Sequence, residues 1–153
     1  MISKVNFDLK EELLLPVFLQ ETGKFIISDV AKEQGKTDEF LAAVQQTKDV
    51  AQLEKEYFGS STSTITASIF KHWKLSDKLV GMIEYVDDLA NCPAEYKKEA
   101  QILHIAKIAC SVVNPLSEAN CELAIEKAKQ FGLDTAPLIK AIEKMQDRVL
   151  DEE

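Results

Sequence analysis

The two histidines are the first residues to consider for chemistry, because imidazole can bind a metal or transfer a proton. His72 and His104 are the only histidines in the 153 residues. Neither has a second imidazole or a cysteine at the spacing of a metal-ligand pair. We therefore expect structural roles for both, with His72 on the solvent side of its helix.

The three cysteines are the next candidates. Cys92, Cys110 and Cys121 form an odd, widely spaced set without a CxxC pair. Such a set is not typical of a disulfide framework or a zinc site. Cys110 and Cys121 also have no nearby base in the sequence that would activate a nucleophile. We expect buried or incidental thiols.

Hydroxyl side chains gather in residues 60–64, directly after Gly59. This run lacks the glycine spacing of a phosphate-binding loop. Serine and threonine are favoured at helix N-caps, so the run predicts the start of a helix. One face of that helix is expected to be apolar and buried, formed by Ile65, Ile69, Phe70 and Trp73.

Composition and charge exclude several classes of protein. The hydrophobic share is 46% and the charged share 29%, which are ordinary values for a globular domain. Five glycines and four prolines are few, and this favours long helices over a turn-rich β architecture. The net charge of −8 makes binding to nucleic acid or to anionic lipid unexpected.

No apolar run approaches the roughly 20 residues that a membrane-spanning helix needs. The run Leu13–Leu19 is short, and acidic residues precede it where a secretory signal would be basic. We expect a cytoplasmic protein that does not associate with membranes.

Hydrophobic periodicity and cap residues predict an all-α fold. The expected helices are Asp8–Phe18 with a break at Pro16, Phe25–Gly35, Thr37–Val44, Asp49–Phe58, Thr62–Trp73, Leu79–Val86, Glu95–Val113 as the longest, Ser117–Phe131 and Asp134–Val149. The length predicts one helical domain over residues 1–153. Residues 1–7 and 151–153 are expected to be flexible ends.

The apolar residues of Leu13–Phe18 cover more than one face of their expected helix. A helix of this kind is normally buried on several sides. We therefore expect the rest of the chain to cover one side of it. A second copy or another protein is expected to cover the other side, through the Leu13–Phe18 region.

Several motifs occur in an order that resembles the HDOD family, the HD-related output domains of bacterial signalling proteins. Gly23-Lys24 follows an apolar helix, and Phe58-Gly59 precedes a helix that continues through Ala67, Ile69, Phe70, Trp73 and Leu75. The resemblance covers nearly the whole chain, but only the second half of a full-length HDOD domain. It implies a compact multi-helix bundle similar to the core of HD-type metal phosphohydrolases.

The first positions that the resemblance assigns to a metal site differ from the family pattern. Gln20 and Glu21 stand where the family has His-Asp, and Ser61-Thr62 stands where it has Asp-His. The acidic residue that precedes the aromatic-glycine turn in the family is matched by Glu56.

The later positions differ as well. Val86-Asp87 replaces paired histidines, and Lys107 replaces the Asp of an Ala-Asp pair. The resemblance thus implies a vestigial metal site at Gln20, Glu21, Thr62, Val86, Asp87 and Lys107. A divalent metal requires imidazoles and carboxylates that converge on one point. Glu21 alone cannot hold one, so we expect no bound metal, no other cofactor and no catalytic residue.

The leading hypothesis is a non-catalytic signalling module that works through protein contacts. One alternative is a divergent HD-type phosphohydrolase with a rearranged metal site around Glu21, Asp87 and Asp88. Another is a nucleotide or metabolite sensor, in which Lys24 and Lys107 would bind phosphate in the emptied pocket.

Glu21 keeps the negative charge of the Asp that it replaces, whereas Lys107 reverses the charge at its position. We expect the two to approach each other, directly or through one water, with hydrogen bonds from Thr62 or Gln20. Otherwise Lys107 extends to solvent and Glu21 caps the next turn.

Overall fold

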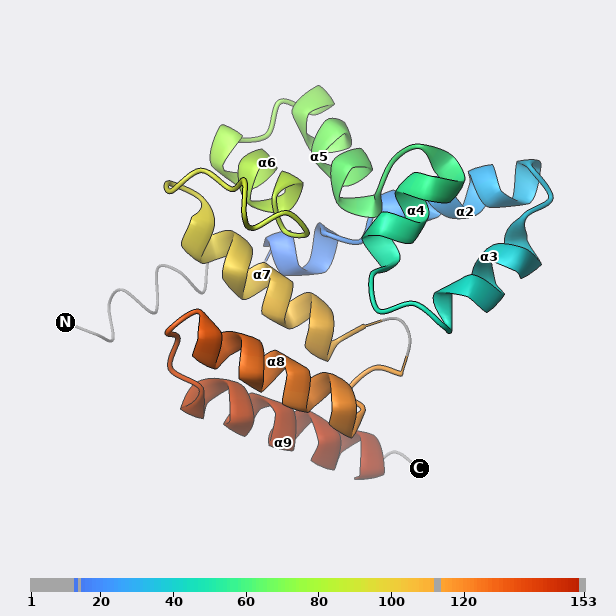
Figure 1. Cartoon of the computed structure of the whole chain (residues 1–153). Coiled ribbons are helices and arrows are strands. Elements are labelled where there is room, and N and C mark those ends of the chain that lie inside the picture. The colour runs from blue at the N-terminus through green and yellow to red at the C-terminus, as the bar shows by residue number, and fades with distance from the viewer. Residues whose placement is uncertain (1–12, 14, 112–113, 152–153) are drawn as a thin grey trace. The chain divides into compact units, whose positions relative to one another are not determined.

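The computed structural model describes residue 13, residues 15–111 and residues 114–151 (Figure 1). The expected all-α fold is confirmed, because the described part consists of helices and loops without a strand. Its helices are α2 (Gly23–Glu33), α3 (Thr37–Val44), α4 (Val50–Phe58), α5 (Thr62–His72), α6 (Asp77–Glu84), α7 (Lys97–Ala109), α8 (Glu118–Gln130) and α9 (Ala136–Asp151). Residues 15–19 are also helical. Within this part, no helix combines the length and apolar character needed to cross a membrane.

The chain forms two compact units, Met1–Ala100 and Gln101–Glu153. Helix α7 begins in the first unit and ends in the second. The expectation that the 153 residues act as one domain stays a prediction. In the first unit, α5 packs against both α2 and α6, and α4 contacts α2, α3 and α5.

Four helices begin at a side-chain cap. Asp49 Oδ1 accepts a hydrogen bond from Gln52 N at 2.9 Å and caps α4. Serine side chains cap three other helices in the same way, Ser61 for α5, Ser76 for α6 and Ser117 for α8. Gly59 ends α4 with φ +78°, a left-handed conformation that glycine adopts without strain.

One predicted helix is too long. The expected helix Glu95–Val113 is observed as α7, which ends at Ala109. Ser111 N bonds to the carbonyl three residues back, and Leu116 N bonds to Ala109 O at 2.9 Å. The helical pattern has thus ended by Ser111, and residues 112–113 of the predicted helix lie outside the described part. Among the helices that the structure describes, the longest is α9, with 16 residues.

The buried face of α5 also differs from the prediction. Trp73 is 59% exposed, and Ile65 and Ile69 are only partly buried. The buried residues of this helix are Thr62, Ser63, Thr66, Ala67 and Phe70. Phe70 is buried as expected, but hydroxyl residues rather than Ile65, Ile69 and Trp73 make up much of the buried face.

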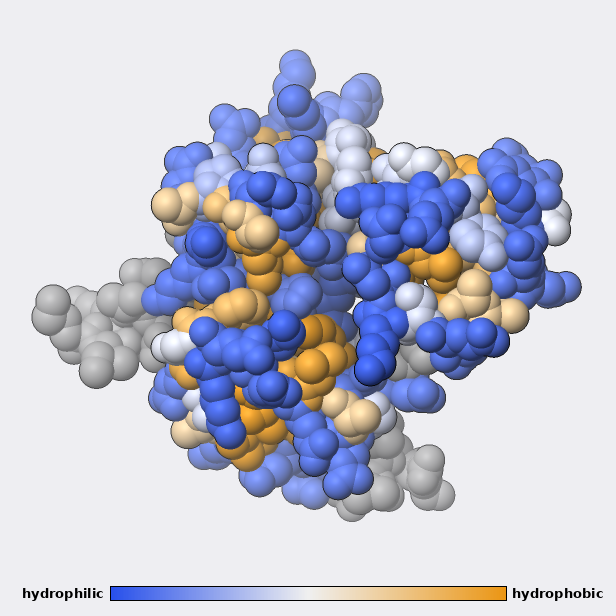
Figure 2. Space-filling model, viewed as in Figure 1, coloured by the Kyte–Doolittle hydropathy of each residue, from blue (hydrophilic) through white to orange (hydrophobic). Residues whose placement is uncertain are grey.

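The second unit has a small apolar core. Its buried members are Ile105, Ala109, Ala124 and Ala128, and the half-buried Ile108, Phe131, Leu133 and Leu138 pack against them. Alanines on α8 allow close approach of the neighbouring helices. Figure 2 shows hydrophobic side chains among the polar ones around α8 and α9, where Leu123 and Met145 are exposed.

Candidate functional site: a polar network on α2, α4 and α5

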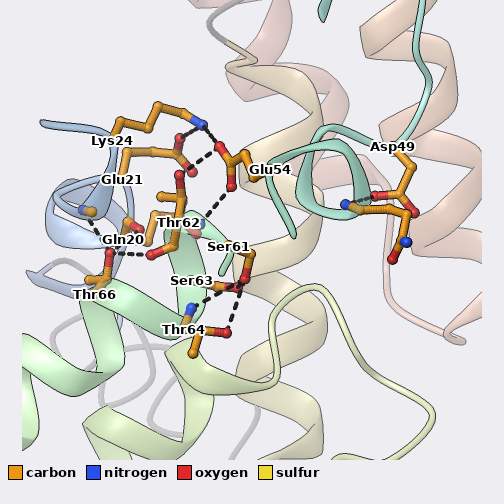
Figure 3. A network of polar contacts seen from close by, with 12 residues as sticks. Gln20, Glu21, Lys24, Asp49, Glu54, Ser61, Thr62, Ser63, Thr64 and Thr66 are labelled. Carbon is orange, nitrogen blue, oxygen red and sulfur yellow. Dashed lines mark hydrogen bonds and ion pairs between the residues drawn. The ribbon is translucent and has the colours of Figure 1, made fainter. Parts of the chain in front are cut away.

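The centre of the network is the carboxylate of Glu54, which is 3% exposed (Figure 3). Its Oε2 accepts a hydrogen bond from Thr62 N at 2.6 Å, and its Oε1 accepts one from Thr62 Oγ1 at 2.7 Å. Thr62 N is one of the free backbone donors in the first turn of α5. A carboxylate at this place is favoured by the dipole of the helix as well. Glu54 thus joins α4 to the start of α5.

Lys24 supplies the positive charge of the network. Its Nζ lies 2.9 Å from Glu21 Oε2 and 3.4 Å from Glu54 Oε1. Burial alone would lower the pKa of Lys24, but the two carboxylates outweigh it and the net shift is upward. Lys24 therefore stays an ammonium that joins the turn before α2 to α4.

Thr66 connects α5 to the same turn. Its Oγ1 accepts a hydrogen bond from Gly23 N at 2.9 Å and lies 2.8 Å from Thr62 O and 3.1 Å from Gln20 O. A Cβ at Gly23 would collide with the backbone of α5 at Thr62. Glycine at this position is what allows α2 and α5 to come so close.

Gln20, at a position that the resemblance assigns to a histidine, is 4% exposed. Its Oε1 is buried without a hydrogen-bond partner among the described residues. A buried amide oxygen of this kind costs free energy. As a metal ligand, the neutral oxygen of an amide is also weaker than an imidazole nitrogen.

The hydroxyl run after Gly59 forms a cap, as predicted. Ser61 Oγ accepts a hydrogen bond from Thr64 N at 3.4 Å. The same oxygen lies 3.1 Å from Ser63 Oγ and 3.0 Å from Thr64 Oγ1. These hydroxyls bind one another and the first turn of α5.

The structure brings four of the residues singled out in the sequence into this network, namely Gln20, Glu21, Lys24 and Thr62. Val86 lies after α6 and is 1% exposed, and its apolar side chain offers no ligand atom. Lys107 belongs to the second unit, so its pairing with Glu21 stays a prediction. Within the first unit, Glu21 forms an ion pair with Lys24.

The rearranged metal site is not found. Asp88 is exposed, and both of its carboxylate oxygens lie 3.0 Å from Asn91 Nδ2. In residues 13, 15–111 and 114–151, no three His, Cys, Asp or Glu side chains are grouped so that they could hold an ion. Glu21, Asp87 and Asp88 therefore do not form such a group.

The hydrogen bonds and ion pairs of the network described above involve no histidine or cysteine. His72 is exposed, as expected, and the ring of His104 contacts that of Phe131 at a centroid distance of 6.4 Å. All three cysteines are free thiols, with Cys92 and Cys121 buried and Cys110 exposed. Burial raises the pKa of the Cys92 and Cys121 thiols, so these two are protonated at neutral pH.

Glu54 is the residue that sequence reasoning missed, since it assigned the acidic position to Glu56. Glu56 is exposed, and its Oε1 accepts a hydrogen bond from Gln52 Nε2. Helical spacing contained the signal. Glu54 lies four residues after Val50 and four before Phe58, which places it on the apolar face of α4.

Comparisons with known proteins identify the family. Residues 1–89, more than half of the chain, match the family described as HDOD domain. A crystal structure of a virulence factor from Campylobacter jejuni subsp. jejuni has a similar fold, with a TM-score of 0.65 and 23% sequence identity. The match covers 83% of this chain and 48% of that one, so the chain spans about half the length of that protein. No curated protein sequence matches. The chain belongs to the HDOD domain family.

Proposed function

We propose that this chain is a non-catalytic regulatory module of bacterial signal transduction that acts in the cytoplasm through protein–protein contacts. The observation that carries the proposal is the network around Glu54. Its acidic groups are bound to Thr62 and to the ammonium of Lys24. The carboxylates of Glu21 and Glu54 thus converge on the ammonium of Lys24, which occupies the place that a cation would need.

The donor set does not fit a catalytic metal ion. A transition metal needs several imidazoles, thiolates or carboxylates around one centre. The assigned positions offer an amide at Gln20, a hydroxyl at Thr62 and an alkyl chain at Val86. Lys24 Nζ also lies within 3.4 Å of both carboxylates of the network and would repel a cation at the same place. We derive no hydrolytic step from this site.

The network also argues against a phosphate sensor at this place. Lys24 was the candidate phosphate partner in the first unit, and it contacts two carboxylates. A phosphate group would have to displace Glu21 or Glu54 and then lie beside the remaining negative charge. The regulatory hypothesis therefore stands ahead of the sensor hypothesis.

A surface for protein contacts is available on the first unit. Phe18 is 75% exposed and Leu15 is 52% exposed, although Leu13 and Pro16 of the same segment are buried. This matches the expectation that one side of the Leu13–Phe18 region is covered by the chain itself. The uncovered side supports a role for this region in binding another protein.

The proposal is tested by assaying the full chain with Mn²⁺, Zn²⁺ and Mg²⁺ in turn. We expect no hydrolysis of a generic phosphodiester or phosphomonoester and no metal-specific rise in melting temperature. A matched variant, Lys24→Gln, controls for inhibition of metal binding by the ammonium. Metal-dependent turnover by the native chain would overturn the proposal, and turnover by the variant alone would identify Lys24 as the group that blocks metal binding.

A further inference from the structure

The second unit carries two of the three cysteines, one at each end of the loop that joins α7 to α8. Cys110 directly follows the last residue of α7, and Cys121 lies in the first turn of α8. The two thiols differ in access, because Cys110 is exposed and Cys121 is buried. An exposed thiol that oxidants reach first and a second thiol close by are the two parts of a redox-sensitive pair.

The loop folds back and brings the two helix ends together. Leu116 N donates a hydrogen bond to Ala109 O at 2.9 Å, and Ala109 is the residue directly before Cys110. Cys121 N donates a hydrogen bond to Ser117 O at 2.9 Å, so Cys121 lies one helical turn after the end of the loop. Both cysteines are therefore only a few residues from the same backbone contact.

The side chain of Cys121 lies on the side of α8 that faces the end of this loop. Gln146 Nε2, on α9, donates a hydrogen bond to Leu116 O at 3.1 Å and lies 3.8 Å from Cys121 Sγ. Ala109 and Ala124 belong to one buried cluster, and Cys121 precedes Ala124 by one helical turn. The sulfur of Cys121 thus lies at the edge of this cluster, toward the residues that follow α7.

The two sulfurs are close enough for one to influence the ionisation of the other. Burial is the main cause of the raised pKa of Cys121, and the charge of Cys110 is the second cause. A charge acts on a neighbouring pKa in this way only over a short distance. Burial also raises the pKa of Cys92, but the charges that act on that thiol come from a lysine and two carboxylates. Geometry and electrostatics therefore single out the same two cysteines.

We propose that Cys110 and Cys121 are a modification site, at which a hydroperoxide converts the two thiols into an intramolecular disulfide bond. The exposed sulfur of Cys110 attacks hydrogen peroxide, the O–O bond breaks, and a sulfenic acid and one water are formed. The sulfur of Cys121 then attacks the sulfenic sulfur. The S–S bond forms as the hydroxyl group leaves with the proton of the Cys121 thiol as a second water. The two thiols lose two electrons, and the peroxide gains them.

The position of Cys110 determines how the bond forms. A disulfide requires the two Cα atoms to come within about 7 Å of each other. Because Cys110 lies beyond the last residue of α7, a shift of the loop supplies this approach while the helices keep their places. The sequence offers no base beside either cysteine, so we expect a slower reaction than that of a thiol held as a thiolate. Thiols of a reducing compartment would break the bond again, which makes the modification reversible.

The test treats the reduced full chain with hydrogen peroxide at low protein concentration, alkylates the remaining thiols and maps the products by mass spectrometry. We expect each chain to lose two hydrogen atoms, with Cys110 linked to Cys121 and Cys92 alkylated. Dithiothreitol should reverse the change completely. Oxidation of Cys110 to a sulfinic acid without a bond would overturn the proposal. A bond that joins Cys110 mainly to Cys92 or to a second copy would overturn it as well.

Two controls separate the folded geometry from closeness in the sequence. Cys92→Ser removes a buried thiol of the first unit and should leave bond formation unchanged, whereas Cys110→Ser should abolish it. In concentrated urea the native chain should also form a bond between Cys92 and Cys110, which the folded chain should not form. The same mixture of bonds with and without urea would contradict the proposed pair. None of these outcomes bears on metal binding or hydrolysis, so the inference can fail while the non-catalytic proposal stands.

Discussion

At the scale of single residues, the network around Glu54 shows how a buried carboxylate can be stabilised without a metal ion. Two donors from Thr62 and the ammonium of Lys24 surround it. Removing one member of a buried ion pair usually lowers the stability of the fold by more than the pair contributes. The reason is that the remaining charge stays buried without a partner.

Glu54→Leu should lower the free energy of unfolding by roughly 3–5 kcal/mol, because it leaves Thr62 N and Oγ1 buried without an acceptor. Glu56→Leu is the matched control two residues away. Its side chain is exposed, so its effect should stay within about 0.5 kcal/mol. Urea denaturation of both variants measures the difference. Similar losses of unfolding free energy in the two variants would contradict a stabilising role for the buried carboxylate of Glu54.

Lys24 predicts a change of stability at alkaline pH. Its pKa is raised above the ordinary value of 10.5 in the folded chain. The stabilisation by its charge is therefore complete below the pKa of the unfolded chain and is lost as pH rises through the folded pKa. The advantage of the native chain over Lys24→Met, about 1–2 kcal/mol, should stay constant from neutral pH to about 10 and shrink above that.

Thermal melts of the native chain and of Lys24→Met across this pH range check the prediction. Lys48→Met, which changes an exposed lysine, should show no alkaline loss of this size relative to the native chain. If the difference in stability between the native chain and Lys24→Met were lost at acidic pH instead, the carboxylates and not the ammonium would set the pH dependence.

At the scale of elements, α5 is positioned by polar side chains that point into the first unit. Thr62, Ser63 and Thr66 are all buried, and Thr66 binds the turn before α2. Hydrogen bonds are directional, so they fix the rotation of a helix more narrowly than apolar contacts do.

Thr66→Val keeps the shape of the side chain but removes its hydroxyl. It should destabilise the chain by about 1–3 kcal/mol, because Gly23 N loses its acceptor and is left buried. Ser68→Ala on the exposed side of α5 also removes a hydroxyl that bonds within the helix, and it should cost less than about 0.5 kcal/mol. Equal effects in calorimetry would contradict a special role for the buried hydroxyl.

The helices differ in how far their sequence predicts them. Caps at Asp49, Ser61, Ser76 and Ser117 were predictable, because they depend on one side chain and a backbone group three residues away. The polar buried face of α5 was not, because threonine becomes a core residue only when another element supplies its hydrogen-bond partner. The end of α7 depends in the same way on a bond from Leu116, seven residues further on.

At the scale of the whole molecule, the HDOD family could be predicted from the order of motifs, and the all-α fold from hydrophobic periodicity and cap residues. The residues of the candidate site could be predicted only in part. Gln20 and Thr62 could be predicted from their places in a motif. Glu54 is identified as a site residue only when it is known which face of α4 packs against α5. In the network, Glu54 binds Thr62, and Thr66 binds the backbone of Gln20.

Elemental analysis of the full chain, purified without chelators from cells supplied with manganese, iron and zinc, tests the central claim most directly. We predict less than stoichiometric amounts of each transition metal, because the carboxylates of Glu21 and Glu54 are bound to Lys24 and Thr62. One equivalent of a transition metal, retained through dialysis and lost on substitution of Glu21 or Glu54, would contradict the account.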